Sequence, residues 1–556
     1  MAFGFLGTMR QNHEDTKDSA AAVGEGLRDF RSSGKGDHAL PLSPGTIFGG
    51  DELAENMMCR EKSMSWGYLF KHYRHAMLWA ALMATPFVFQ GYATTLLSDL
   101  FSYGPFMSKF GRPLSGQTEN AIPIPWQTGI TIASACGRLM GLWMAPYVLR
   151  FVGYRTSSDA GLVLAFFSTV IGMFSLGAEN PLAVFLVGQL CLAVPMGLLQ
   201  GIILPYISDV TPLQLRAPAS AVINLFPLAG QFVSAAVLRG APLVGDPNWS
   251  IMYPFLVNLV WLLLLRHMIC MAPESPVYLV QRGHDVQARL VLGRLHRCPD
   301  LAPDTALSVL KAVDAHEKRT SGETGLLRCF RGVHLRRTEI AVMVSITQQC
   351  VGMPLVSYPL QLLHQDGLST PPALRITFGL LGLFSLSTLL AMPTMRFVGR
   401  RTLWLAGLAL ELTILVALGG LDLYESHGSE DVSVMIAYLT LFLGLVYHFT
   451  TGPVCYAIVA ETPATRVKVE TNALACAAHT LLSIVNVFLV PQLLASEPLG
   501  WNMGSRAALV WAGTTAACLA WAWFRLPETK DRSPTEMDLL FKEHKVAARQ
   551  WPAATF

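Results

Sequence analysis

Charged residues are scarce in this 556-residue chain: Asp, Glu, Lys and Arg make up 14% of it, against 52% hydrophobic residues. Soluble globular chains carry roughly a quarter of charged residues. Helices that face lipid need fewer charges, so the composition indicates a membrane protein. The net charge of +3 is small, which argues against nucleic acid as a partner.

Paired cysteines and nucleotide-binding loops are also missing. The ten cysteines are scattered and none stands in a CxxC pair, so we expect no disulfide framework and no metal site. No Walker A sequence and no Gly-rich dinucleotide fingerprint occurs. The sequence therefore predicts neither an enzyme nor a cofactor, and it provides no nucleotide site for ATP-driven transport.

Long hydrophobic runs are the feature that the sequence has in excess. A membrane-spanning helix needs about 20 mostly apolar residues. Twelve such runs are present, so we expect an all-α membrane protein with twelve transmembrane helices. The expected spans are 76–97, 129–149, 160–176, 182–207, 221–238, 253–272, 340–363, 376–395, 403–421, 434–459, 472–494 and 507–523.

The order of runs and polar segments predicts five parts. A disordered tail over 1–75 precedes a six-helix half over 76–272, and a charged central loop over 273–338 leads to a second six-helix half over 339–526 and a tail over 527–556. Lys and Arg gather in the central loop and in other loops on the same side of the expected spans, whereas the opposite loops are acidic or mixed. The positive-inside rule places that side in the cytosol.

Two short segments repeat at equivalent places in the two halves. Arg150–Arg155 reads RFVGYR after the second expected helix, and Arg396–Arg401 reads RFVGRR after the eighth. The repetition indicates an internal duplication in parallel orientation.

Two further motifs carry a family resemblance. Pro273–Pro276 reads PESP after the sixth expected helix, and Pro527–Lys530 reads PETK after the twelfth. The pair resembles the sugar-porter branch of the major facilitator superfamily. Other segments resemble the fungal maltose and α-glucoside permeases, over about 73–541: Gly91-Tyr92, Lys109–Gly111, Pro125–Gln127, Gly188-Gln189, Pro195, Asn224, Gly230-Gln231, Arg336–Ile340, Gly452–Tyr456, Glu461 and Asp538–Phe541.

The resemblance implies a carrier that moves a sugar by alternating access between two pseudo-symmetric halves. Maltose or another α-glucoside is the expected substrate, the lipid bilayer and a small molecule are the expected partners, and the chain is expected to act as a monomer in the plasma membrane. Two alternatives stay open at this stage: a transporter or exporter of a non-sugar metabolite, and a nutrient sensor that transports nothing.

The resemblance also implies a sugar site. Neutral amides both donate and accept hydrogen bonds, as sugar hydroxyls require, and an aromatic ring packs beside the sugar ring. The residues that match the family's sugar-site positions are Gln348, Gln349, Asn224, Tyr456 and Tyr358. For Asn224, a purely structural hydrogen bond between helices is an equal alternative. Adjacent Gln348 and Gln349 favour a site, since two amides are costly to bury without a use.

Charged residues after the fourth and tenth expected helices form a second candidate set. Asp209 is followed by Arg216, and Glu461 is followed by Arg466 and Lys468. The resemblance implies that these pairs hold the cytosolic helix ends together in one transport state. The alternative is surface charge, in which an ion pair contributes about 0–1 kcal/mol.

Several interior residues depart from the family pattern. Proton-coupled relatives carry two acids on the first helix, where this chain has Gln90 and Ala93, so proton coupling is doubtful. Arg138 replaces an acid on the second helix and is a candidate for coupling or for a substrate charge. His448 and His479 are candidates for proton transfer, although a structural histidine is the commoner case.

Overall fold

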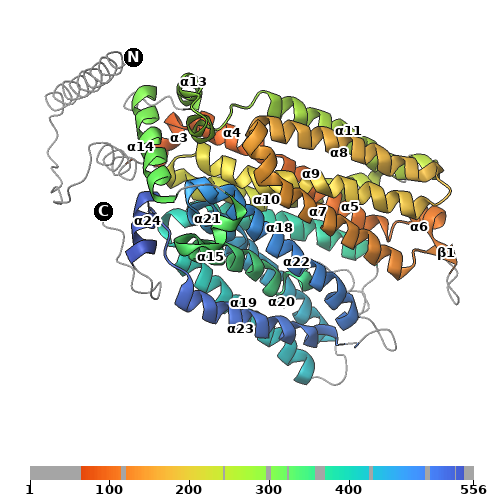
Figure 1. Cartoon of the computed structure of the whole chain (residues 1–556). Coiled ribbons are helices and arrows are strands. Elements are labelled where there is room, and N and C mark those ends of the chain that lie inside the picture. Colours follow the sequence, from red (N-terminus) through yellow and green to blue (C-terminus); the bar gives the residue numbers. More distant parts are fainter. Residues whose placement is uncertain are drawn as a thin grey trace, which may run out of the picture. The chain divides into compact units, whose positions relative to one another are not determined.

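The computed structural model describes residues 64, 66–113, 120–241, 245–295, 302–321, 325–356, 370–424, 430–494, 501, 503–532 and 534–543. The chain divides into two compact units, Met1–Gly49 and Gly50–Phe556, and all described residues lie in the second. Their regular structure is helical except for one antiparallel pair of two-residue strands, β1 (Arg112–Pro113) and β2 (Asn120–Ala121) (Figure 1).

The first half of the described chain forms long helices joined by short turns. Its elements are α3 (Trp66–His72), α4 (Arg74–Ala84), α5 (Pro86–Leu100), α6 (Gly104–Phe110), α7 (Ile124–Val152), α8 (Tyr154–Phe174), η1 (Ser175–Gly177), α9 (Pro181–Val210), α10 (Leu213–Gly240) and α11 (Pro247–Cys270). α4 and α5 form one spanning segment with a break at Thr85, because Pro86 lacks the N–H that would continue the helix.

The central segment is largely helical, whereas we expected a charged loop. It contains α12 (Pro276–Gln281), α13 (Asp285–Leu295), α14 (Pro303–Ser321) and η3 (Leu326–Phe330). α13 and α14 are amphipathic, and Leu279, Val280 and Ala288 form a small buried cluster between α12 and α13. The expected tail over 1–75 is also shorter than predicted, since α3 and the start of α4 lie within it.

The second half repeats the pattern of long helices. Its elements are α15 (Gly332–Cys350), α16 (Met353–Val356), α18 (Thr370–Phe397), α19 (Arg400–Tyr424), α20 (Glu430–Phe449), α21 (Thr451–Glu461), η4 (Thr465–Val467), α22 (Lys468–Leu494), η5 (Gly504–Ala507), α23 (Ala508–Arg525) and α24 (Pro534–Glu543). α20 and α21 form one spanning segment broken at Thr450, whose backbone has φ −115° and ψ −88°.

Eleven helical segments of the described chain are long and apolar enough to cross a membrane. α15 stands where the seventh span was expected but is not among them. Arg336, Arg337 and Glu339 place three charges in its first half, and the apolar residues 357–363 of the expected span lie outside the described residues. Twelve helices therefore remain the expected number for the whole chain.

Small residues bring neighbouring helices into close contact. A Cβ added at Gly137 or Gly141 of α7 would lie 2.3 or 1.9 Å from a backbone oxygen of α9, and one at Gly91 of α5 would lie 2.1 Å from the Pro227 oxygen of α10. Such close backbone approach is typical of helices packed within a membrane. These positions fix how α7 and α5 present their polar residues to the second half.

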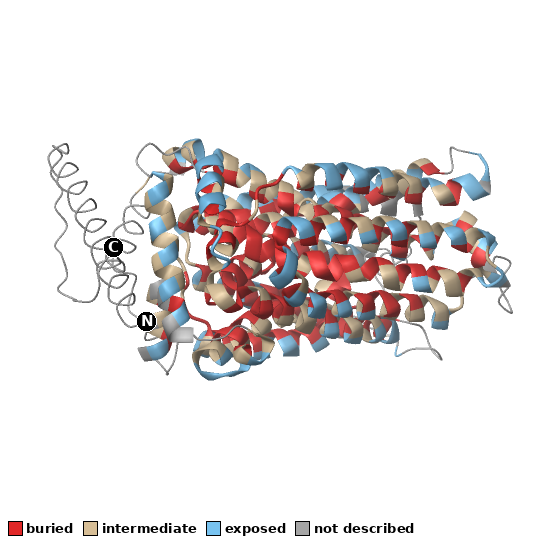
Figure 2. Ribbon diagram, turned by 45° about the horizontal axis from the view of Figure 1, so that its top comes forward, coloured by how far each residue is buried: buried red, intermediate tan, exposed pale blue. Residues whose placement is uncertain are grey.

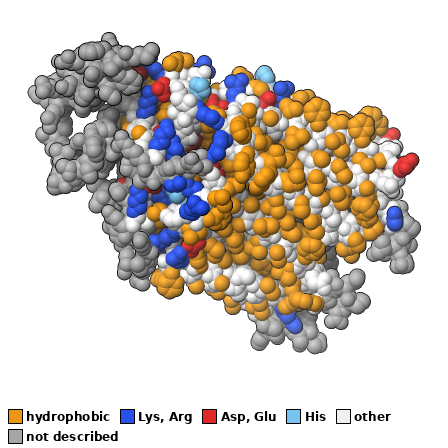
Figure 3. All heavy atoms as spheres, in the orientation of Figure 1, with side chains coloured by type: hydrophobic (Ala, Val, Ile, Leu, Met, Phe, Trp, Pro, Cys, Tyr) orange, Lys and Arg blue, Asp and Glu red, His pale blue; other side chains and the backbone are white. Residues whose placement is uncertain are grey.

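Helices of the two halves also pack against each other. α7 lies against α22, and α10 lies against α18 and α21. Buried residues occupy the faces that helices turn toward one another, and exposed residues lie on the outward faces (Figure 2). Large apolar side chains cover the outward faces, and Lys and Arg gather at one end of the helices (Figure 3). We call this the basic end; it contains Arg150, Arg155, Arg216, Arg400 and Lys468.

Candidate functional site

Two predicted amides meet the second half where α21 begins. Asn224 Nδ2 of α10 donates to Thr388 Oγ1 of α18 at 3.0 Å and lies 3.2 Å from His448 Nδ1 of α20. Gln348 Nε2 of α15 donates to the Gly452 carbonyl oxygen at 3.1 Å. Asn224 Oδ1 lies 3.0 Å from the place of a Cβ on Gly452, so a larger residue there would crowd the amide. Two of the three polar partners, His448 and the Gly452 carbonyl, thus lie beside the break at Thr450, and Thr388 is supplied by α18.

A second polar group lies between α15 and α22. Gln349 Nε2 lies 2.9 Å from His479 Nε2, and Asn486 Nδ2 donates to Gln349 Oε1 at 3.1 Å. Asn486 also donates to the Gln349 carbonyl oxygen at 3.1 Å. The Gln349 side chain is therefore held in one orientation by two residues of α22.

Arg138 stands at the midpoint of the 29-residue helix α7 and faces α22. Its charge acts on Cys476 and His479 of α22, and Cys476 also interacts with Tyr456 of α21. We call Arg138, Gln349, Tyr456, Cys476 and His479 the central polar cluster. All five keep part of their surface accessible, and Arg138 lies far from both ends of α7. The fifth predicted sugar-site residue, Tyr358, lies outside the described residues.

Two glutamates at the basic end cap helices in the same way in both halves. Glu274 accepts hydrogen bonds from the backbone N–H groups of Tyr154 and Arg155 at 2.8 and 3.2 Å. Glu528 accepts from the N–H groups of Arg400 and Arg401 at the same two distances. Each carboxylate therefore satisfies the free N–H groups of a helix start, α8 or α19, and complements the helix dipole.

The preceding glycines make this capping possible. Gly153 has φ +85°, a conformation that favours glycine, and a Cβ there would lie 2.9 Å from the Glu274 carboxylate. A Cβ on Gly399 would lie 2.1 Å from the Glu528 carboxylate. The repeated RFVG segments thus serve one purpose in both halves.

The next acid in each half has different partners. Glu461 accepts from Arg400 at 3.0 Å and from Thr529 at 2.6 Å, both within its own half. In the first half, Tyr154 occupies the place equivalent to Arg400.

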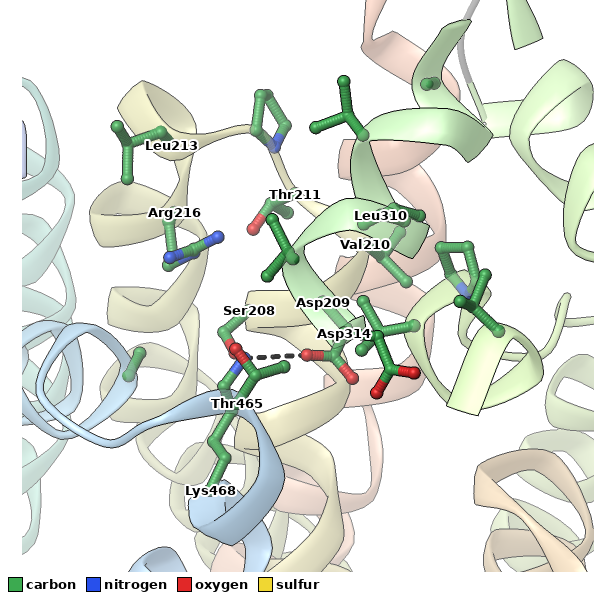
Figure 4. Close-up of a pocket in the computed structure, with 18 of the residues that line it drawn as sticks. Ser208, Asp209, Val210, Thr211, Leu213, Arg216, Leu310, Asp314, Thr465 and Lys468 are labelled. Carbon is green, nitrogen blue, oxygen red and sulfur yellow. Dashed lines mark hydrogen bonds and ion pairs between the residues drawn. The ribbon is translucent and has the colours of Figure 1, made fainter. Parts of the chain in front are cut away.

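Among the described residues of its own half, Asp209 therefore has hydroxyl partners and no arginine. Tyr154 Oη donates to it at 3.3 Å and Ser275 Oγ at 3.0 Å. Its ion pair is instead with Lys468 of α22, across the two halves, at 2.8 Å (Figure 4).

Among the described residues, neither charged motif pairs its own acid with its own base in this conformation. Arg216 forms no ion pair with any described residue, because the turn at Thr211-Pro212 places it on α10 while Asp209 ends α9. Arg466 pairs with Asp314 of α14 at 2.8 Å rather than with Glu461. The seven-residue spacing brings the acid and the base to the same region but not to each other.

A cavity of about 230 Å³ lies beside these charges (Figure 4). It is enclosed by the ends of α9 and α10, by α12 to α14 and by the segment before α22, and its lining includes Asp209, Arg216, Asp314, Thr465 and Lys468.

The carboxyl groups of α14 differ in their electrostatic environment. Burial raises the pKa of Glu317, which accepts a hydrogen bond from the Thr465 N–H. Burial also acts on Asp314, but hydrogen bonds from Lys318 and Arg466 outweigh it and hold the pKa of that carboxyl below its usual range. Asp314 is therefore an ionised anchor between α14 and the segment before α22.

The chain matches one family model, described as sugar (and other) transporter, over residues 60–541. This range covers both halves and the central segment. The chain belongs to the sugar (and other) transporter family. It is therefore a multi-pass membrane transporter and not an enzyme.

Curated relatives of this transporter are yeast permeases. The general alpha-glucoside permease of Saccharomyces cerevisiae is 31% identical over 499 residues, which cover 88% of this chain and 79% of the relative. A maltose permease of the same yeast is 28% identical over 488 residues, or 87% and 78% of the two chains. The predicted resemblance to fungal maltose and α-glucoside permeases is confirmed.

Solved structures show the fold. The proton:xylose symporter XylE bound to 6-bromo-6-deoxy-D-glucose superimposes with a TM-score of 0.73 at 22% identity, over 85% of this chain and 100% of that one. An inward open conformation of XylE from E. coli gives a TM-score of 0.59 at 21% identity, over 84% and 98%. The predicted major facilitator fold is confirmed.

Sequence reasoning missed several polar residues of this transporter that join helices. Thr388 and Asn486 contact the predicted amides, and Asn472 of α22 donates to the carbonyl oxygens of Gln200 and Gly201 of α9 at 3.1 and 2.9 Å. Each is a lone polar residue in an apolar run, and this isolation was the sequence signal that could have identified it. Glu411 of α19 is fully buried and accepts a hydrogen bond from Thr451 at 2.6 Å, away from the central polar cluster.

Proposed function

We propose that this transporter carries α-glucosides, with maltose as the first candidate. The observation that carries the proposal is the group of amides that α10 and α15 direct toward the helices of the second half. Amides match the alternating donors and acceptors of a sugar, and relatives named for α-glucosides and maltose share most of the chain.

The proposed sugar site uses Asn224, Gln348, Gln349, Tyr456 and Tyr358. Gln349 and Tyr456 are partly accessible, and Asn224 and Gln348 are buried at the contact with α21. A sugar hydroxyl would exchange with the protein partners of these amides, so that no polar group is left without a hydrogen bond. The side chains that hydrogen-bond to one another would then reorient around the substrate.

Alternating access requires the halves over 76–272 and 339–526 to rock about this site. The basic end faces the cytosol in this proposal, in line with the positive-inside rule. The Asp209–Lys468 ion pair joins the two halves there and holds the cytosolic side closed. We propose the plasma membrane as the location and a monomer as the working unit.

Facilitated diffusion is the proposed mode of transport. Gln90 and Ala93 cannot titrate, so the two positions of the first spanning segment at which proton-coupled relatives carry acids offer no proton carrier here. His448 and His479 remain the candidates for proton transfer, and each already contacts an amide, Asn224 or Gln349.

Uptake of radiolabelled maltose by cells without their own sugar carriers tests the function. We expect uptake that a protonophore does not abolish and that stops at equal concentrations inside and outside. Concentrative uptake that the protonophore abolishes would contradict facilitated diffusion. No uptake, with the protein shown at the cell surface, would overturn the α-glucoside assignment.

A further inference from the structure

Arg138 is a cation at the midpoint of a spanning helix, and no described carboxylate compensates it. No ion pair or hydrogen bond joins its guanidinium to a described residue, and its Nε is buried without a partner. An arginine stays charged in every protein environment. A charge in the membrane interior is strongly disfavoured unless a counter-charge or water accompanies it.

The helices packed against α7 do not supply that counter-charge. Toward α22, Arg138 faces Cys476 and His479, neither of which is an acid. The acid of α22, Glu470, acts on Arg150 instead, which lies about 18 Å farther along α7 at a helical rise of about 1.5 Å per residue. Toward α9, the Arg138 backbone meets Gly197, which has no side chain.

Arg138 keeps part of its surface accessible, as do Gln349, Tyr456 and His479 of the central polar cluster. The central polar cluster thus combines one fixed positive charge with neutral donors and acceptors and an aromatic ring. This is the donor set for a sugar that carries one negative charge.

We propose that Arg138 binds a carboxylate on the substrate, so that the preferred substrate is a sugar acid rather than a neutral sugar. The proposal rests on the proposed function, because it assigns a charge to a ligand of the same site. A guanidinium pairs with a carboxylate through two parallel hydrogen bonds. One arginine matches the single charge of a carboxylate better than the double charge of a phosphate monoester.

Two open-chain sugars that differ only in the charged group provide the test. Maltobionate carries a carboxylate where maltitol carries a hydroxymethyl group. We expect the purified full-length transporter to bind maltobionate at least about tenfold more tightly than maltitol, measured by calorimetry in detergent; tenfold corresponds to about 1.4 kcal/mol. Arg138→Gln should remove most of this preference, and Arg138→Lys should keep part of it.

Arg239→Gln is the matched control, since Arg239 is an exposed arginine in the last turn of α10. It should leave the ratio of the two affinities unchanged. Equal affinities for maltobionate and maltitol in the unaltered protein would overturn the proposal, as would an unchanged ratio in Arg138→Gln. Glucose 6-phosphate bound more tightly than maltobionate would overturn the choice of a carboxylate.

These outcomes are separable from the proposed function, because binding is measured without transport. Maltose uptake in cells without a preference for maltobionate would leave the function standing and sink the inference. A preference for maltobionate in a protein that takes up no maltose would support Arg138 as an anion site and overturn the neutral α-glucoside as substrate.

Discussion

Removing either partner of the Asp209–Lys468 ion pair should open the cytosolic side, but by different amounts. The two side chains are 5% and 9% exposed, so the pair is largely removed from water. Losing one partner of a buried pair costs about 3–5 kcal/mol when the other is left alone. Asp209→Asn removes the ion-pair partner of Lys468, and we expect the closed state to lose about 3 kcal/mol, a shift of about 150-fold in its equilibrium with the open state.

Lys468→Gln should have a smaller effect. Asp209 would keep the hydroxyl donors Tyr154 and Ser275, and a glutamine amide also donates. We therefore expect a loss of about 1–2 kcal/mol, or roughly tenfold. The two variants should therefore differ in how far they destabilise the closed state, because Asp209 has the hydroxyl donors Tyr154 and Ser275. An ion pair without such additional donors would predict equal effects.

Alkylation of a cysteine at Thr465, which lines the cavity beside the pair, measures the opening. The labelling rate from the cytosolic side should follow the open population, so Thr465→Cys combined with Asp209→Asn should react fastest. Arg266→Gln is the control, because the Arg266–Asp159 pair is 48% and 28% exposed and such surface pairs contribute about 0–1 kcal/mol. Equal labelling in the two variants, or no change in either, would refute the reasoning.

Three further outcomes follow from the same contacts. Tyr154→Arg gives Asp209 an arginine in its own half, as Glu461 has, so labelling at Thr465 should rise while thermal stability is retained. The lowered pKa of Asp314 means that its contribution to stability is present above the ordinary value of 3.8 and is lost as the pH falls through the lowered pKa; Asp314→Asn should flatten the acid side of a plot of Tm against pH. In liposomes, maltobionate should distribute with an imposed potential, about 50-fold at 100 mV, whereas maltose should not.

The fold was predictable because its signals are local. A run of about 20 apolar residues defines a spanning helix whatever it packs against, and the PESP and PETK motifs mark the same place in each half. Helix ends were less predictable, as α3 and α12 to α14 show, since amphipathic helices at a membrane surface carry too much charge to stand out. The expected seventh span begins at residue 340, whereas α15 begins at Gly332, because the first half of this helix is charged.

The choice of partners could not be predicted, because it depends on how helices meet. Asp209 and Glu461 stand in equivalent motifs, yet one pairs across the halves and the other within its half. The residue that decides the partner is the first residue of an earlier helix, Tyr154 of α8 or Arg400 of α19. Each lies more than 50 positions from the acid in sequence. Thr388 and Asn486 were missed for the same reason, since a lone polar residue in an apolar run does not reveal which residue it will contact.

The loss of acids on the first spanning segment and the gain of Arg138 have a common consequence. A carrier whose interior holds one uncompensated cation meets an electrostatic barrier when it reorients empty, because the charge must move through a region of low dielectric constant. A bound carboxylate neutralises Arg138 and lowers that barrier. A proton or another cation bound at the same place would raise the barrier. With Arg138 bound to a substrate carboxylate, as proposed above, the loaded carrier should reorient more readily than the unloaded one, so a charged α-glucoside should exchange across the membrane faster than it accumulates by net uptake.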